Sequence, residues 1–139
     1  MPAKPLISFI VYNHDAEPAI LSQCLDSITQ LSLASADREI IVVDNGDSTA
    51  ALNILLGKDD EITYIHQRYM GVSAAYSMGL RMSTARYVQF VGSHDLLIRA
   101  PYEHCLDIAR YHNPDVVFYK NTDNPDNATT PFTYEGPMQ

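Results

Sequence analysis

Short apolar runs alternate along the chain with segments whose apolar residues recur at helical spacing. The runs are rich in β-branched residues and are typical of buried strands; they predict strands over residues 6–11, 39–43, 61–66, 86–91 and 115–119. Helices are predicted between them, beginning at Pro18, after Ser48, near Ser73 and at Pro101. This alternation predicts an α/β fold with a mostly parallel sheet, flanked by helices and truncated after about the fifth strand.

The predicted helices differ in the residues that they would pack against the sheet. The first has one apolar face, made of Ile20, Leu21, Cys24, Leu25, Ile28 and Leu31. The helix near Ser73 carries small residues instead, namely Ala74, Ala75 and Gly79, which predict close packing of its backbone on the sheet. In the last helix, we expect the inward residues to be Tyr102, Cys105, Ile108 and Ala109.

Length and charge narrow the classes of protein. A chain of 139 residues suits one domain, which we expect over residues 1–119, with residues 120–139 as an irregular extension rich in Asn, Asp, Thr and Pro. The net charge of −8 comes from 17 acidic and 9 basic side chains and repels nucleic-acid backbones, so nucleic acid is not an expected partner. No segment approaches the roughly 20 apolar residues of a membrane span, and the two cysteines are expected to be buried and reduced, which favours a cytoplasmic protein.

Polar residues follow three of the predicted strands, over residues 12–15, 44–47 and 92–95. In open α/β sheets, ligands bind outside the carboxyl ends of the strands, so these loops are the candidate site. Asp44 has two interpretations there. Its carboxylate can accept hydrogen bonds from a base N–H or ribose hydroxyls, or it can form an Asx turn with Gly46.

Four segments, taken in order, resemble the motifs of family 2 glycosyltransferases. Residues 40–47 read IIVVDNGD, similar to the family's IIVVD-(D/N)-G-S, and the first strand ends in Tyr12-Asn13, similar to its T-Y-N. Residues 71–80, GVSAAYSMGL, resemble G-x-S-x-A-R-N-x-G-I, and residues 86–97, RYVQFVGSHDLL, resemble G-x-Y-I-x-F-L-D-S-D-D-x-L. The resemblance covers about residues 6–119 and implies a GT-A fold that binds a nucleotide-diphospho-sugar, often a UDP-sugar.

The resemblance also implies roles for individual residues. Asp44 is expected to recognise the nucleobase, and the nucleotide-binding residues are expected to be Tyr12, Asn13, Asp44, Asn45 and Ser93. The implied activity is sugar transfer, with inversion, to an acceptor hydroxyl in polysaccharide or glycan synthesis.

The same resemblance implies a divalent ion, Mn²⁺ or Mg²⁺, which neutralises the diphosphate leaving group. The family's two motif acids are replaced here by Gly92 and His94, and Asp95 keeps a carboxylate. His94 and Asp95 are therefore the candidate metal ligands, since imidazole suits Mn²⁺ or Zn²⁺. Neighbouring residues in extended chain point in opposite directions, which favours a solvated loop as the alternative.

Other departures leave the catalytic residues unassigned. Tyr76 and Ser77 replace the family's Arg-Asn pair, and the family's acceptor site and general base lie beyond the fifth strand, where residues 120–139 remain. Two hypotheses follow: a glycosyltransferase completed by further polypeptide, or a catalytically degenerate nucleotide-binding or structural module, with a homodimer as one arrangement. A phosphoacceptor receiver domain fits poorly, because a single acid, Asp15, follows the first strand.

Overall fold

The computed structural model describes residues 4–47, 50–56, 62–68 and 71–117. Its strands are β1 (Ile7–Asn13), β2 (Arg38–Asp44), β3 (Ile62–His66) and β4 (Tyr87–Gly92). Its helices are α1 (Pro18–Thr29), α2 (Ala50–Leu56), α3 (Val72–Met82) and α4 (Arg99–His112), and a short 3-10 helix, η1 (Ser35–Asp37), precedes β2. Strands and helices alternate as the sequence predicts.

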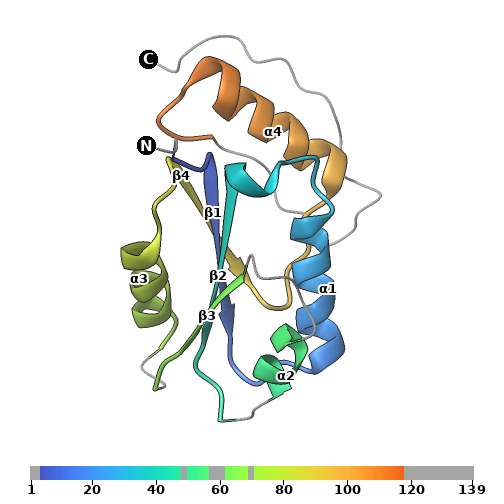
Figure 1. Ribbon diagram of the computed structural model, residues 1–139, viewed down its shortest axis with the longest axis vertical. Helices are drawn as coiled ribbons and strands as arrows, with labels where there is room; N and C mark the ends of the chain where they lie inside the picture. Colours follow the sequence, from blue (N-terminus) through green and yellow to red (C-terminus); the bar gives the residue numbers. More distant parts are fainter. Residues whose placement is uncertain (1–3, 48–49, 57–61, 69–70, 118–139) are drawn as a thin grey trace.

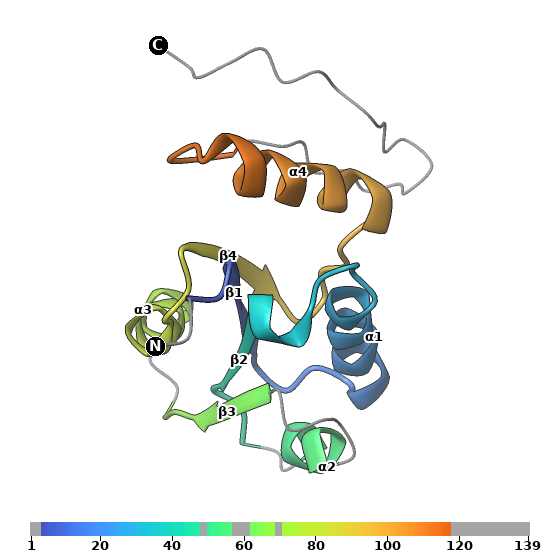
Figure 2. The ribbon, with the colours of Figure 1, turned by 45° about the horizontal axis from the view of Figure 1, so that its top comes forward.

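All strand pairs in the sheet are parallel, and the strand order is β3-β2-β1-β4. The chain starts in the middle of the sheet, moves outward to β3 and then crosses back to β4, so the strand order reverses beside β1. Helices α1 and α2 lie on one side of the sheet and α3 lies on the other (Figure 2). The α/β fold with a parallel sheet flanked by helices is therefore confirmed.

The larger core lies between the sheet and helices α1, α2 and α4. Alternate strand residues such as Phe9, Val11 and Val42 are fully buried there. Helix α1 begins with Pro18 at its first turn, and the face predicted for it is buried except for the half-buried Ile20. From α4, Tyr102 packs its ring 5.9 Å from that of Phe9. The inward residues predicted for α4 are all buried.

The smaller core lies between the sheet and α3. Ala75 is fully buried, and a Cβ built on Gly79 would lie 2.3 Å from Ile10 Cγ2. Only glycine lets the helix backbone come this close to β1. The close packing predicted from the small residues is confirmed.

Some sequence predictions need correction at the ends of elements. β1 does not end at Val11 but continues to Asn13, because Tyr12 and Asn13 keep pairing with the neighbouring strands. In the predicted strand 115–119, the described residues 115–117 are not in a strand: the chain leaves α4 through Asn113, in the left-handed conformation, and Pro114, whose carbonyl accepts a 2.5 Å hydrogen bond from Tyr87 Oη. Residues 118–139 and the predicted cap Ser48 lie outside the described residues.

Candidate functional site at the carboxyl edge

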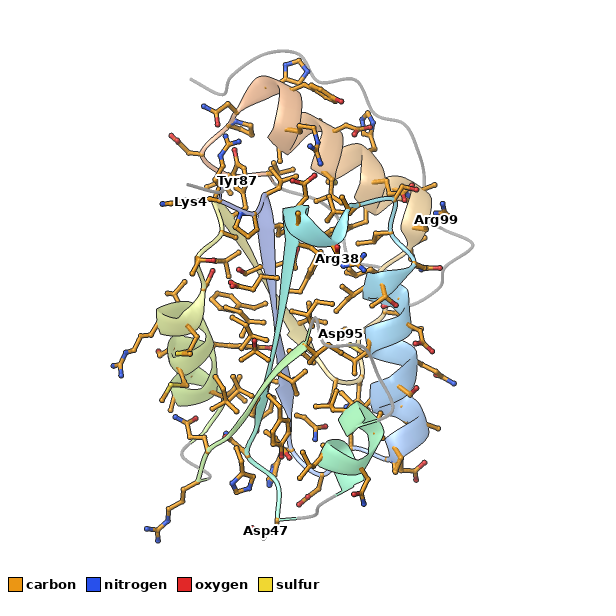
Figure 3. All side chains as sticks on the ribbon, viewed as in Figure 1. Lys4, Arg38, Asp47, Tyr87, Asp95 and Arg99 are labelled. Carbon is orange, nitrogen blue, oxygen red and sulfur yellow. The ribbon has the colours of Figure 1, made fainter. Side chains whose placement is uncertain are left out.

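The polar segments that follow β1, β2 and β4 meet at one edge of the sheet. Asn13 pairs in register with Asp44, and Tyr12 pairs with Gly92. The hydrogen-bond ladder continues one step past the strands, from Asn45 N to Asn13 O (2.8 Å) and from Ser93 N to Tyr12 O (2.9 Å). Figure 1 shows this edge at the lower ends of β1 and β2, and Figure 3 labels Asp47 just beyond it. The three loops thus lie together at the carboxyl edge of the sheet, as the sequence predicts.

Asp44 lies at the centre of a hydrogen-bond network that joins three strands. The residue is fully buried. Its Oδ1 accepts hydrogen bonds from Asn13 Nδ2 (3.2 Å) and Gly46 N (3.0 Å), and its Oδ2 accepts one from Tyr64 Oη (2.6 Å). Burial, and then the hydrogen bond and charge of Asp44, raise the pKa of Tyr64. The carboxylate is thus held in one orientation by donors from β1, β3 and its own turn.

The bond from Gly46 N is the Asx turn considered for Asp44 in the sequence. With two lone pairs on each oxygen, Oδ1 is saturated and Oδ2 retains one acceptor position. Gly46 also lets the loop after β1 come close, because a Cβ at this residue would lie 2.3 Å from Asp15 Oδ1. The Asx turn predicted as one interpretation of Asp44 is therefore present. A role of Asp44 in base recognition would have to use the remaining acceptor position on Oδ2 or act through Asn13.

Three side-chain oxygens at this edge are buried and have no hydrogen-bond partner among the described residues: Asn13 Oδ1, Asn45 Oδ1 and Gln67 Oε1. Asn13 and Asn45 are each 2% exposed. Leaving a buried polar atom unpaired costs about 1–3 kcal/mol. Folding does not explain this cost, so these oxygens are the strongest sign of a binding site at this edge.

Sequence reasoning assigned no role to Gln67 or Tyr64. The alternating pattern of β3 places Tyr64 and His66 on one face of the strand. Which residue of β2 they meet depends on the strand register, in which Asp44 pairs with His66. The ladder then extends from Gln67 N to Asp44 O (2.9 Å). A single sequence does not reveal the register between neighbouring strands. The sequence therefore could not show that Tyr64 and Gln67 lie next to Asp44.

Aromatic rings gather on the α3 side of the same edge. The Tyr12 ring lies 6.0 Å from that of Tyr76, which lies 4.7 Å from that of Phe90. Burial, with smaller contributions led by the charge of Asp95, raises the pKa of the Tyr76 hydroxyl. At the position where the resemblance places an arginine, this chain therefore has a neutral ring packed against two others.

The segment after β4 folds into a tight turn. Gly92 N donates to Asp95 Oδ2 (2.9 Å), and Asp95 N donates to Gly92 O (2.9 Å). A Cβ at residue 92 would lie 3.1 Å from Asp95 Oδ2, so glycine gives this carboxylate room to fold back. Ser93 is buried and His94 is exposed.

This geometry does not assemble a metal site from the two candidate ligands. One oxygen of Asp95 already accepts a bond within its own turn. Within the described part of the chain, no three His, Cys, Asp or Glu side chains are grouped so that they could hold a metal ion.

Comparison with known proteins places this arrangement in a family. The model of Glycosyl transferase family 2 matches residues 8–135. The chain belongs to this family. The match supports the resemblance seen in the motifs and extends beyond residue 119, the predicted end of the domain.

Similar proteins include uncharacterized glycosyltransferases of Rickettsia. The protein from Rickettsia prowazekii is 26% identical over 124 residues, which is 84% of this chain and 36% of that protein. The one from Rickettsia conorii is 32% identical over 63 residues, which is 44% of this chain and 10% of that protein. The chain thus spans little more than a third of the length of the Rickettsia prowazekii protein.

Solved structures show the same fold. Mannosyltransferase PcManGT from Pyrobaculum calidifontis, in complex with GDP-Man and Mn²⁺, has a TM-score of 0.64 and 18% identity, over 78% of this chain and 32% of that chain. S. aureus TarS has the same TM-score and identity, over 78% of this chain and 20% of its own. The fold is that of the GT-A glycosyltransferases. None of the described helices has both the length and the apolar character that a membrane span requires.

Proposed function

We propose that the carboxyl edge of the sheet binds a nucleotide-diphospho-sugar, and that the chain is the donor-binding part of a glycosyltransferase. The observation that carries the proposal is the unpaired, buried Oδ1 of Asn13 at this edge. A fixed hydrogen-bond acceptor at the end of β1 is suited to a donor group on the nucleotide.

The orientation of Asn13 supports this role. Its Nδ2 donates to Asp44 Oδ1, so a flipped amide would place two oxygens against each other. Asp44 therefore holds Asn13 Oδ1 in place as an acceptor, and Tyr64 holds Asp44. A nucleobase N–H, such as N3–H of uracil, can donate a hydrogen bond to this oxygen. The resemblance to family 2 motifs makes UDP the nucleotide that we propose, and Asp44 acts on the base mainly by orienting Asn13.

The other predicted residues complete the proposed pocket. Tyr12 and Ser93 lie beside Asn13 at the ends of β1 and β4, and Asn45 follows Asp44. The mannosyltransferase PcManGT was solved with a nucleotide-sugar and Mn²⁺, which supports the donor class and makes a divalent ion part of the proposal. An ion that neutralises charge on the diphosphate would need ligands in addition to His94 and Asp95, because these two residues do not form a metal site by themselves.

The proposed reaction is transfer of the sugar to an acceptor hydroxyl in glycan or polysaccharide synthesis, in the cytoplasm. A second candidate is a nucleotide-binding or structural module without catalysis, which can pair with a second copy. Two observations favour it: Tyr76 stands at the position of the family's arginine, and Asp95 is tied into its own turn. Both candidates share the nucleotide pocket and differ in turnover.

Calorimetric titration with UDP and UDP-sugars, with and without Mn²⁺, tests the pocket. Asn13→Ala should weaken UDP binding by about 3- to 10-fold, the usual effect of one lost hydrogen bond. Glu39→Gln, at the opposite end of the sheet, is the matched control and should leave binding unchanged. If the wild-type chain binds no uridine nucleotide under any condition, the nucleotide proposal is wrong. UDP-sugar hydrolysis or transfer then separates the enzyme from the binding module.

A further inference from the structure

At the start of α3, no described side chain caps the backbone donors. Gly71 is the N-cap residue, with φ of 96°, and it makes no side-chain cap hydrogen bond. The first intrahelical bond runs from Ala75 N to Gly71 O (3.3 Å). The N–H groups of the first turn therefore point out of the helix with the positive end of its dipole. In the absence of other features, this would favour an anion.

Asn45 is directed at this helix start. Its Nδ2 donates to Gly71 O (3.5 Å), although the residue belongs to the β2 edge. The side chain is 2% exposed, and Oδ1 has no partner among the described residues. Turning the amide over would place Oδ1 against the Gly71 carbonyl, so the observed orientation is the favourable one. A buried acceptor thus lies beside the donors of α3.

Gln67 provides a second acceptor on the neighbouring strand. Asn45 and Gln67 follow Asp44 and His66, which pair in register, and Gln67 N donates to Asp44 O (2.9 Å). Gln67 Oε1 is buried and has no partner in the described part of the chain. The edge of β2 and β3 therefore offers two acceptors without partners among the described residues, and one of them belongs to Asn45, which contacts the start of α3.

This combination favours a ligand group that both donates and accepts hydrogen bonds, and since the proposed function assigns the base N–H to Asn13, it leaves the sugar hydroxyls. A phosphate oxygen can accept from the α3 donors but has no proton for Asn45 or Gln67, and two buried acceptors would repel its charge. A hydroxyl group both accepts from an N–H and donates to an amide oxygen. We propose that Asn45, Gln67 and the start of α3 bind hydroxyl groups of the nucleotide-sugar. This inference rests on the proposed function and adds the residues that recognise the sugar hydroxyls.

The hydroxyls can come from the ribose or from the transferred sugar, and two ligand pairs distinguish these sources. UDP compared with a UDP analogue that lacks both ribose hydroxyls tests the ribose, and UDP-glucose compared with UDP tests the hexose. For the wild-type chain, we expect calorimetry to show a preference of about 3- to 10-fold in one of the two pairs. The preferred ligand is UDP over its analogue if the ribose is bound, or UDP-glucose over UDP if the hexose is bound. In Asn45→Ala this preference should fall to about 2-fold or less, because the hydroxyl has lost its acceptor.

Gln67→Ala is the second variant and should reduce the same preference, so the test does not depend on Asn45→Ala folding. Glu39→Gln is the control and should keep the wild-type preference. If UDP binds and neither pair shows a preference in the wild-type chain, or if the preference survives in both variants, the hydroxyl site is wrong while the nucleotide pocket stands. If no uridine nucleotide binds, the proposed function fails and this inference fails with it.

Discussion

The two ends of the parallel sheet each carry a cluster of polar side chains, and the two clusters use their hydrogen-bonding groups differently. At the amino end, Glu39 Oε1 accepts from Ser8 Oγ (2.6 Å) and Thr84 N (2.9 Å), and Oε2 accepts from Thr84 Oγ1 (3.1 Å). Ser83 Oγ in turn donates to Ser8 Oγ (2.7 Å). This cluster ties β1, β2 and the turn after α3 together, and its oxygens are paired.

At the carboxyl end, both carboxylate oxygens of Asp44 accept hydrogen bonds, as those of Glu39 do. The amide side chains around Asp44 are less completely paired. Asn13, Asn45 and Gln67 each leave a buried oxygen without a partner among the described residues. A polar cluster that serves stability alone pairs its buried groups, because each unpaired one costs free energy. The difference therefore separates a structural cluster from a candidate binding site within one sheet, and the following variants test it.

Asp44→Ala should have the largest effect, with a loss of about 3–5 kcal/mol in the free energy of unfolding. It leaves donors on Asn13, Gly46 and Tyr64 without their buried acceptor. Because the chain has no tryptophan, denaturant unfolding followed by circular dichroism is the appropriate measurement. Asp44→Asn keeps the shape and should cost less. A loss below about 1 kcal/mol for the alanine variant would contradict the central role of this network.

Tyr64→Phe should cost about 1–3 kcal/mol, because Asp44 Oδ2 loses its donor. The pKa of Tyr64 is raised above its ordinary value of 10.0, chiefly by burial. The protonated hydroxyl therefore stabilises the fold fully below pH 10.0, and this contribution is lost as the pH rises above that value. The stability difference between the wild type and Tyr64→Phe should be constant at lower pH and shrink in alkaline solution. A difference that grows with alkaline pH would contradict the assignment.

Glu39→Ala should cost about 1–2 kcal/mol, since this cluster is more accessible to water than Asp44. Thr84 N and Ser8 Oγ lose their acceptor. The variant should retain the wild-type affinity for UDP, measured by calorimetry at a temperature where both chains are folded. Weaker binding of UDP would break the distinction between the two ends of the sheet.

Gly71→Ala should have the smallest effect on stability, about 1 kcal/mol, because the residue has a φ of 96° that L-residues rarely adopt. A Cβ there meets nothing within 4 Å, so the cost comes from the backbone alone. Gly79→Ala is the matched comparison: its Cβ would collide with Ile10, and it should cost more. Because Gly71 begins the helix that forms part of the proposed hydroxyl site, Gly71→Ala should also weaken the binding of uridine nucleotides, measured by calorimetry. Gly79→Ala should lower the free energy of unfolding and leave this binding unchanged.

Much of the fold could be predicted from the sequence because its signals are local. The β-branched runs identified β1, β2, β3 and β4, and Pro18 and the apolar face identified α1. The small residues of α3 predicted its close approach to β1, which Gly79 and Ile10 confirm. The run at 115–119 shows the limit, since its described residues do not form a strand although their composition favours one.

The sequence alone determined the family, the order of elements and the edge of the sheet where polar residues gather, because these follow from periodicity and from motifs within single segments. The tertiary structure decided which groups at that edge are paired. Strand register brings Tyr64 to Asp44 and sets Gln67 beside Asn45, and burial then determines which oxygens are left without a donor. Hydrogen-bond satisfaction depends on neighbours far apart in the chain, and no local pattern of residues specifies it.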